Sequence, residues 1–129
     1  MMPISEFLTV IAKTAGKECS LAWIVSLDEL SAKGGIYMEA GEGFVQESFF
    51  DKTEVKTIPV LIMCRDADQQ RCMEQLEGIC NYFQRLKEYP SGSTFSWLDA
   101  EIAKYPSKIG RDEDGVYHYS AILNCKLYF

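Results

Sequence analysis

The chain has 129 residues, of which 47% are apolar and 25% charged, a balance typical of one globular domain spanning residues 1–129. This composition excludes an intrinsically disordered tail and a disulfide-dense scaffold. The formal net charge of −6 gives a field that on average repels nucleic acid and anionic membranes.

Targeting and membrane segments are not expected. Residues 1–6 lack the basic and apolar regions of a secretory signal, and no apolar run reaches the roughly 18–20 residues of a membrane span. We therefore expect a protein that is made and kept in a cytoplasm and that has no membrane partner.

The five cysteines are odd in number and widely separated, with no C-x-x-C pair and only one histidine to complete a zinc site. They are Cys19, Cys64, Cys72, Cys80 and Cys125. Free cysteine behaves as a small apolar residue, and Cys72 and Cys80 share one face of a helical pattern, so both should face the same core. We expect no bound metal.

The first third of the chain predicts one clear helix and one clear strand. Apolar residues recur at helical spacing over residues 4–15, with Gly16 in the position of a C-terminal cap. Apolar residues alternate over 21–27, which favours a strand, but Ile24 breaks the alternation and a short helix remains an alternative. A short strand is expected around residues 36–38, between glycine-rich turns.

The glycines of this region do not predict a phosphate-binding loop. A G-x-x-x-x-G-K-[ST] sequence is absent, and Gly41-Glu42-Gly43 lacks the third glycine and the following helix of a dinucleotide site. We therefore expect no nucleotide cofactor.

The middle of the chain predicts a strand followed by the longest helix. Residues 58–64, IPVLIMC, are apolar throughout, which indicates a strand covered on both faces. Asp66 stands three residues before Gln69, the spacing of a capping box, and a helical period continues to Leu86. Pro90 bounds this helix, whose polar face is interpreted as solvated, with a binding surface as the less favoured alternative.

The last third predicts a β-hairpin. Extended segments over 94–105 and 116–129 flank the acidic cluster Asp112-Glu113-Asp114-Gly115. In the second segment most odd-numbered residues are apolar or aromatic, so one face of that strand should be buried. Asp-Gly supplies positive backbone φ, so Gly115, together with Gly110, is expected to shape the turn.

A calcium loop of the EF-hand type does not fit the same cluster. With Gly115 at position six, Gly110 and Ala121 would occupy positions one and twelve, where carboxylates are required. The acidic cluster therefore predicts a turn and not a metal site.

Catalytic residues are not expected. His118 has no accompanying nucleophile or metal motif, and the Asp99 and Glu101 carboxylates are most simply an exposed face of a strand. Aromatic residues gather near the final hairpin, where core and subunit-interface roles explain them best. Trp97 is the strongest candidate for an interface anchor.

Together the elements predict an α+β fold, with a mixed or mainly antiparallel sheet packed by two main helices and a C-terminal β-hairpin. Two segments, IPVLIMCRDADQQRCMEQLEGICNYF and YPSKIGRDEDGVYHYSAILNCKLYF, carry a further signal. With the rest of the chain they resemble the small tail-terminator and head–tail joining proteins of long-tailed bacteriophages, often labelled minor capsid proteins. The most specific part is the Pro-x-x-Ile-Gly-Arg-Asp-x-Asp-Gly run at residues 106–115.

The resemblance implies a structural virion protein, of a phage or a prophage, that is assembled in the cytoplasm of the bacterial host. It implies a homo-oligomeric ring, usually a hexamer, that caps the tail tube and joins it to the head connector proteins. Its partners would be further copies of itself, the tail tube protein and the connector, and DNA would pass through it without specific binding. The alternative function is a small-ligand-binding or regulatory α+β module without catalysis.

The net negative charge is informative for such a ring. A channel lined with carboxylates would repel phosphates and keep DNA from adhering, whereas a basic channel would hold it. We therefore expect Asp112, Glu113 and Asp114 to face the channel or its rim, and Arg111 to pair with a neighbouring subunit. With Trp97, these residues are the predicted oligomer or lumen contacts.

Overall fold

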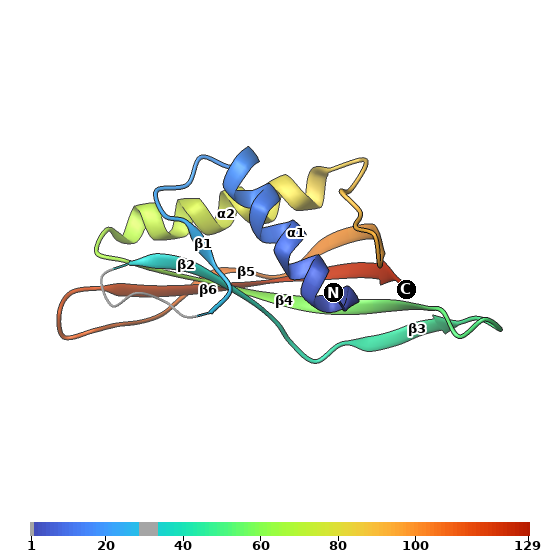
Figure 1. The fold of residues 1–129 in the computed structure, drawn as a ribbon. Helices are drawn as coiled ribbons and strands as arrows, with labels where there is room; N and C mark the ends of the chain where they lie inside the picture. The colour runs from blue at the N-terminus through green and yellow to red at the C-terminus, as the bar shows by residue number, and fades with distance from the viewer. Residues whose placement is uncertain (1, 29–33) are drawn as a thin grey trace.

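Two helices, α1 (Pro3–Glu18) and α2 (Gln69–Arg85), lie on one face of a β-sheet, and in the part of the chain that the structure describes the other face carries no helix (Figure 1). The computed structural model describes residues 2–28 and 34–129. Within these residues the sheet has six strands. The predicted α+β class, with two helices on a mainly antiparallel sheet, is confirmed.

The sheet order is β1-β2-β4-β6-β5, and β3 pairs with the part of β4 that extends beyond β2. Its strands are β1 (Val25–Ser26), β2 (Gly35–Ala40), β3 (Phe44–Ser48), β4 (Glu54–Asp66), β5 (Ser96–Arg111) and β6 (Tyr117–Tyr128). The β1–β2 pair is parallel and the other pairs are antiparallel. The sheet is therefore mixed, and β5 and β6 form the predicted C-terminal hairpin.

The core lies between the helices and the inner face of the sheet. On β4 the inward residues Ile58, Val60 and Ile62 are buried, whereas Leu61 and Met63 on the other face are only half-buried. The prediction that this strand is covered on both faces is therefore wrong. Its apolar run supplies one face to the helices and leaves the other on the open side of the sheet.

The predicted parity of β6 is confirmed at most positions, although Tyr117 is only half-buried. Tyr119, Leu123 and Leu127 are buried, while Asn124 and Lys126 on the alternate face are more exposed. Ser120 also departs from the prediction, because it lies on the outward face but is buried. Its hydroxyl accepts a hydrogen bond from Lys104 Nζ at 3.2 Å, so the serine is covered without being part of the core.

Both helices differ from the predicted boundaries. Helix α1 continues through Gly16 to Glu18, and its cap is Cys19, whose N–H donates to the carbonyl of Ala15 at 3.0 Å. The assignment of Gly16 as the cap is therefore wrong. Helix α2 begins after Asp68, whose carboxylate accepts from the Arg71 N–H at 3.2 Å, and Asp66 has a different role described below.

The structure also contains a hairpin that the sequence pattern did not predict. Strand β3 and the start of β4 form it, and it extends beyond the helices at one end of the molecule (Figure 1). We call residues 44–57 the β3–β4 arm. Over 21–27, where a strand was favoured, only the two residues of β1 are extended and paired.

Candidate functional site

The β5–β6 turn lies at the end of the sheet opposite to the β3–β4 arm (Figure 1). The Asp112 N–H donates to the Val116 carbonyl at 2.8 Å, and the Gly115 N–H donates to the Asp112 carbonyl at 3.0 Å. Gly115 has a φ of +83°, a conformation that residues with a Cβ rarely adopt. The turn chemistry assigned to Asp-Gly is therefore present in the structure.

Gly110 has a different environment. It lies inside β5, opposite His118 of β6, and a Cβ added there would have no atom within 4 Å. Its φ is not in the left-handed region. Gly110 is therefore a strand residue beside an irregularity in the β5–β6 register, and its assignment to the turn is wrong.

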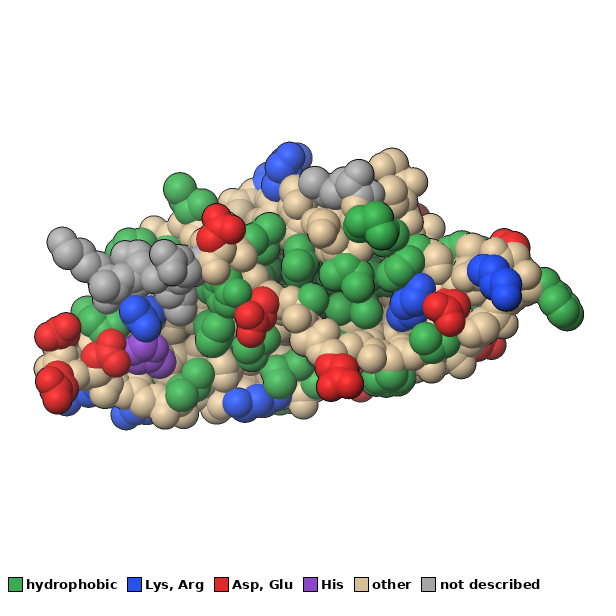
Figure 2. Space-filling model, turned by 60° about the horizontal axis from the view of Figure 1, so that its bottom comes forward, with side chains coloured by type: hydrophobic (Ala, Val, Ile, Leu, Met, Phe, Trp, Pro, Cys, Tyr) green, Lys and Arg blue, Asp and Glu red, His purple; other side chains and the backbone are tan. Residues whose placement is uncertain are grey.

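Three carboxylates project from this turn. Asp112, Glu113 and Asp114 are exposed, and Figure 2 shows acidic side chains gathered at this end of the molecule. His118 Nε2 lies 2.9 Å from Asp112 Oδ1, a distance at which a protonated imidazole forms an ion pair. The Arg111 guanidinium lies over the ring of Tyr117, 5.6 Å from its centroid, within the same subunit. We call residues 112–115 the acidic turn.

Trp97 lies in the core of the subunit and not on its surface. Only 4% of it is exposed, and its ring centroid lies 5.0 Å from Phe7, 5.2 Å from Phe83 and 4.9 Å from Tyr89. It is opposite Leu127 on the inner face of the sheet. An interface anchor needs exposed surface, so the assignment of Trp97 to that role is wrong, and the residue instead packs α1 and α2 onto β5.

The β3–β4 arm carries several exposed apolar side chains, including Phe50, the most exposed among the described residues. Phe50 at its turn is fully exposed, and Phe44, Val45 and Phe49 are exposed by 57%, 49% and 45%. Phe49 makes an edge contact with Tyr128 at 5.9 Å. A cluster of exposed apolar side chains is typical of an interaction surface. The Phe-Val and Phe-Phe pairs inside an otherwise polar stretch were the sequence signal for it.

The open face of the sheet is hollowed beside the arm. This hollow has a volume of about 250 Å³ and is lined by Phe44, Gln46, Thr57, Asp99, Glu101, Asn124 and Lys126. Asp99 is paired in register with Lys126, so a cation accompanies the two carboxylates that the sequence brought to attention. This arrangement favours a solvated polar surface over a catalytic pair of carboxylates.

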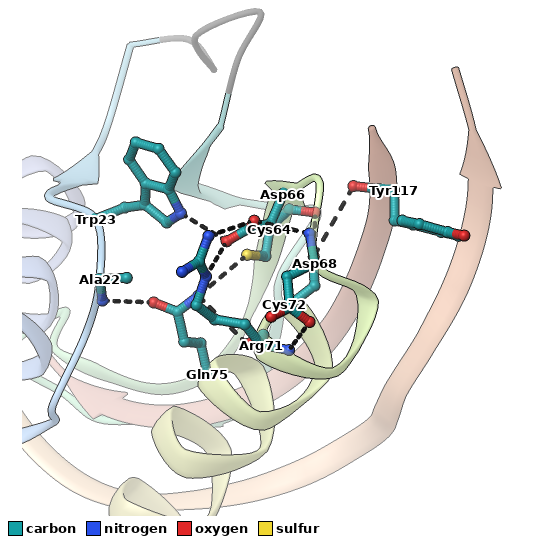
Figure 3. Close-up of polar contacts among 9 residues, drawn as sticks. All are labelled: Ala22, Trp23, Cys64, Asp66, Asp68, Arg71, Cys72, Gln75 and Tyr117. Atoms are coloured by element: carbon teal, nitrogen blue, oxygen red, sulfur yellow. Dashed lines mark hydrogen bonds and ion pairs between the residues drawn. The ribbon is translucent and has the colours of Figure 1, made fainter. Parts of the chain in front are cut away.

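A buried carboxylate joins three segments on the helical side of the sheet (Figure 3). Asp66, 1% exposed, accepts hydrogen bonds from Arg71 Nε at 2.7 Å, Arg71 Nη2 at 2.8 Å and Trp23 Nε1 at 2.9 Å. The hydrogen bonds from Arg71 are the largest cause that lowers the pKa of Asp66 to about 2. Asp66 is therefore an anchor for the segment before β1 and not the cap of α2.

Gln75 reinforces the same connection. It is buried on α2, and its Oε1 accepts a hydrogen bond from the Ala22 N–H at 2.7 Å (Figure 3). The sequence placed Gln75 and Arg71 on a solvated helix face. Their polar groups instead hold residues 22–23 against α2, because that irregular segment has backbone and indole N–H groups that need acceptors.

The cysteines are free thiols, and all but the half-buried Cys19 are buried. Cys72 and Cys80 both face the core, as predicted. Among residues 2–28 and 34–129, no three His, Cys, Asp or Glu side chains are placed to hold a metal ion. In the same residues, neither helix is long and apolar enough to cross a membrane.

Residues 20–129 match the family described as bacteriophage tail terminator protein. The chain belongs to this family. No match was found among curated proteins. Family membership confirms the resemblance seen in the sequence and gives the chain a structural role in the phage tail, as a component of the virion.

For a tail terminator, the surfaces that contact other tail or head proteins are the functional sites. The structure offers three exposed surfaces of different chemistry: the apolar β3–β4 arm, the acidic turn and the open face of the sheet. The matched region contains all three, whereas α1 precedes it.

Proposed function

We propose that the chain caps the tail tube and joins it to the head connector as a homo-oligomeric ring. The match of residues 20–129 to the tail terminator family carries this proposal. In this role the chain binds copies of itself, the tail tube protein and the connector, and it performs no catalysis. Residues 1–129 act as one domain of each subunit.

The shape of the subunit supports a ring. Copies related by rotation, in contacts that join unlike surfaces, need two different complementary surfaces on each copy. The β3–β4 arm and the acidic turn lie at opposite ends of one sheet and differ in chemistry (Figures 1 and 2). A subunit with two unlike ends is better suited to such a ring than to a two-fold dimer, which uses the same surface twice.

The acidic turn supports passage of DNA without binding. We place Asp112, Glu113 and Asp114 at the channel or its rim, where their charges repel phosphates. Arg111 is the last residue of β5 and precedes these carboxylates in the chain. Its guanidinium can pair with a neighbouring subunit.

Assembly with tail tube protein tests this function. Tail tube protein of the same phage is polymerised with and without an excess of the chain and examined by negative-stain electron microscopy. We expect shorter tubes with additional density at one end, and native mass spectrometry of the chain should give a ring mass, with six copies as the expected number. Tubes of unchanged length without end density would contradict the proposal.

A further inference from the structure

The β3–β4 arm projects an apolar side chain that its own subunit does not cover. Phe50 is fully exposed, and the turn that carries it is closed by hydrogen bonds within the arm. The Lys52 N–H donates to the Phe49 carbonyl at 3.0 Å, and the Phe49 N–H donates to the Thr53 carbonyl at 2.9 Å. Phe50 is therefore presented at the end of an ordered hairpin, which is a suitable form for insertion into a groove.

The same chain contains an apolar groove on its helical side. It lies between α1 and the segment that contains β1, and its volume is about 470 Å³, within the range of ligand pockets. Its lining residues are Thr9, Ala12, Lys13, Gly16, Leu21, Ala22, Trp23, Ile24, Val25 and Leu27. We call it the α1 groove. Ile24 on its wall is 92% exposed, so apolar surface is open to a partner.

Charge identifies which groove suits the arm. Residues 47–54 of the arm carry Glu47, Asp51 and Glu54 against one lysine, whereas Lys13 is the one ionisable side chain among the described residues that line the α1 groove. A second groove beside α1, of about 460 Å³, is lined by Lys13 and Lys17 but also by Glu18 and Glu88. Its carboxylates would repel the arm, so the α1 groove is the complementary surface.

Geometry excludes insertion of the arm into its own groove. The arm extends from the end of the sheet, away from β1 and the part of α1 that border the α1 groove (Figure 1). We infer that the arm of one subunit inserts Phe50 into the α1 groove of a second copy of this chain. This inference rests on the proposed ring, and it assigns the contact between neighbouring subunits to two unlike surfaces.

A photo-crosslinking experiment locates the contact directly. Phe50 is replaced by benzoylphenylalanine in a mixture of isotope-labelled and unlabelled chains, so that crosslinks between chains are recognised by mass. We expect crosslinks to Thr9, Ala12 and residues 21–27 of the second chain, which border the α1 groove and not the second groove. Crosslinks to the open face of the sheet, to the second groove or to added tail tube protein would overturn the inference. The inference is also overturned if the benzoylphenylalanine variant forms the same oligomer as the wild type but gives no crosslinks between chains.

Matched substitutions test the energetics. Phe50→Ala should weaken self-association about tenfold, as expected for an aromatic anchor, while Phe44→Ala on the same arm should change it little. Lys13→Glu should weaken association severalfold, whereas Lys17→Glu, with the same charge change one helical turn away, should have a smaller effect. Association is measured by analytical ultracentrifugation, with circular dichroism as the control for folding.

The outcomes separate this inference from the proposed ring. If the wild-type chain assembles and Phe50→Ala assembles equally well, the arm contact is wrong and the ring stands. If Lys17→Glu weakens association as much as Lys13→Glu, the second groove is the receptor and the assignment of the α1 groove is wrong. A wild-type chain that remains monomeric, alone and with tail tubes, overturns both proposals.

Discussion

Asp66 connects the end of β4 and the start of α2 to Trp23, which is 43 residues away in sequence. Its carboxylate lies at the end of β4 and accepts from Arg71 in the first turn of α2 and from Trp23 before β1. If either the carboxylate or its hydrogen-bond donors were removed, the remaining buried polar groups would have no partners. Asp66 therefore controls the position of the segment that forms one wall of the α1 groove.

Removal of this carboxylate should be costly. We expect Asp66→Ala to lower the free energy of unfolding by about 2 kcal/mol, because hydrogen bonds to a charged group are lost and the Trp23 indole N–H loses its acceptor. The control Asp68→Ala removes only the helix cap and should cost about 1 kcal/mol. Urea denaturation at pH 7 measures both. An equal or smaller loss for Asp66→Ala would contradict the anchoring role.

Gly115 is the second residue whose identity matters locally. A valine at its φ of +83° is strained, so Gly115→Val should destabilise the protein by about 1 kcal/mol or more. Gly110→Val is the matched control, because Gly110 lies in a strand with open space around it and should tolerate a β-branched residue. Thermal unfolding measures the difference.

Added calcium should leave the wild-type melting temperature unchanged, since the turn is not a metal loop.

At the scale of elements, Glu6 fastens the start of α1 to the loop before β5. Its carboxylate accepts from the Thr94 N–H at 2.8 Å, the Thr94 hydroxyl at 2.7 Å and the Ser93 hydroxyl at 2.8 Å. These hydrogen bonds, those from Thr94 first, lower the pKa of Glu6 from 4.5 to about 2. The connection is therefore stronger while the carboxylate is charged.

This fastening predicts a pH dependence. A carboxyl whose folded pKa is lowered stabilises the protein fully above its unfolded pKa, and the contribution is lost as pH falls through the folded value. The free energy of unfolding should therefore decline from about pH 4.5 toward pH 2. Asp66, whose pKa is also lowered to about 2, should add to this decline below its ordinary pKa of 3.8. Glu6→Gln should flatten this profile, measured by melting temperature against pH. An unchanged profile would contradict the role of Glu6.

The acidic turn is an element whose charge can be changed without loss of core contacts. Replacement of Asp112, Glu113 and Asp114 by lysine should leave folding nearly intact, because all three side chains are exposed. If the turn faces the channel, the variant ring should bind duplex DNA more tightly at low salt and should impair DNA ejection or particle maturation. Fluorescence anisotropy with duplex DNA and phage yield are the measurements. No change in either would remove this turn from the mechanism.

At the scale of the whole molecule, the two helices and the sheet share one aromatic cluster. Phe7 of α1, Phe83 of α2 and Tyr89 each make a ring contact with Trp97 of β5, which is the centre of the cluster. Contacts of this kind couple the unfolding of the elements that contribute to them. The arm and the acidic turn project from opposite ends of this common core (Figure 1).

Such coupling predicts one cooperative transition. Urea unfolding followed by tryptophan fluorescence, which reports on Trp23 and Trp97, should coincide with unfolding followed by far-ultraviolet circular dichroism. The expected result is a single midpoint for both signals, as for one domain over residues 1–129. Two separated midpoints would show that the chain contains more than one folding unit.

Sequence by itself determined the features that depend on local periodicity and turn chemistry. The spacing of Phe7 and Ile11, the long helical pattern before Pro90 and the alternation from Tyr117 to Leu127 follow directly from which side of a helix or strand each position occupies. Asp-Gly at 114–115 identified the hairpin turn, because few residues accept positive φ. The specific run at 106–115 supported the resemblance to tail terminators.

The tertiary structure alone decided which surfaces are covered. Trp97 was assigned to an interface but lies beneath both helices, and Leu61 is apolar yet lies on the open face of the sheet. Asp66 was assigned to a cap but binds Trp23 and Arg71. In each case periodicity gives the direction of a side chain, whereas burial and hydrogen bonding depend on which distant segment packs against that side, and no local pattern encodes that partner.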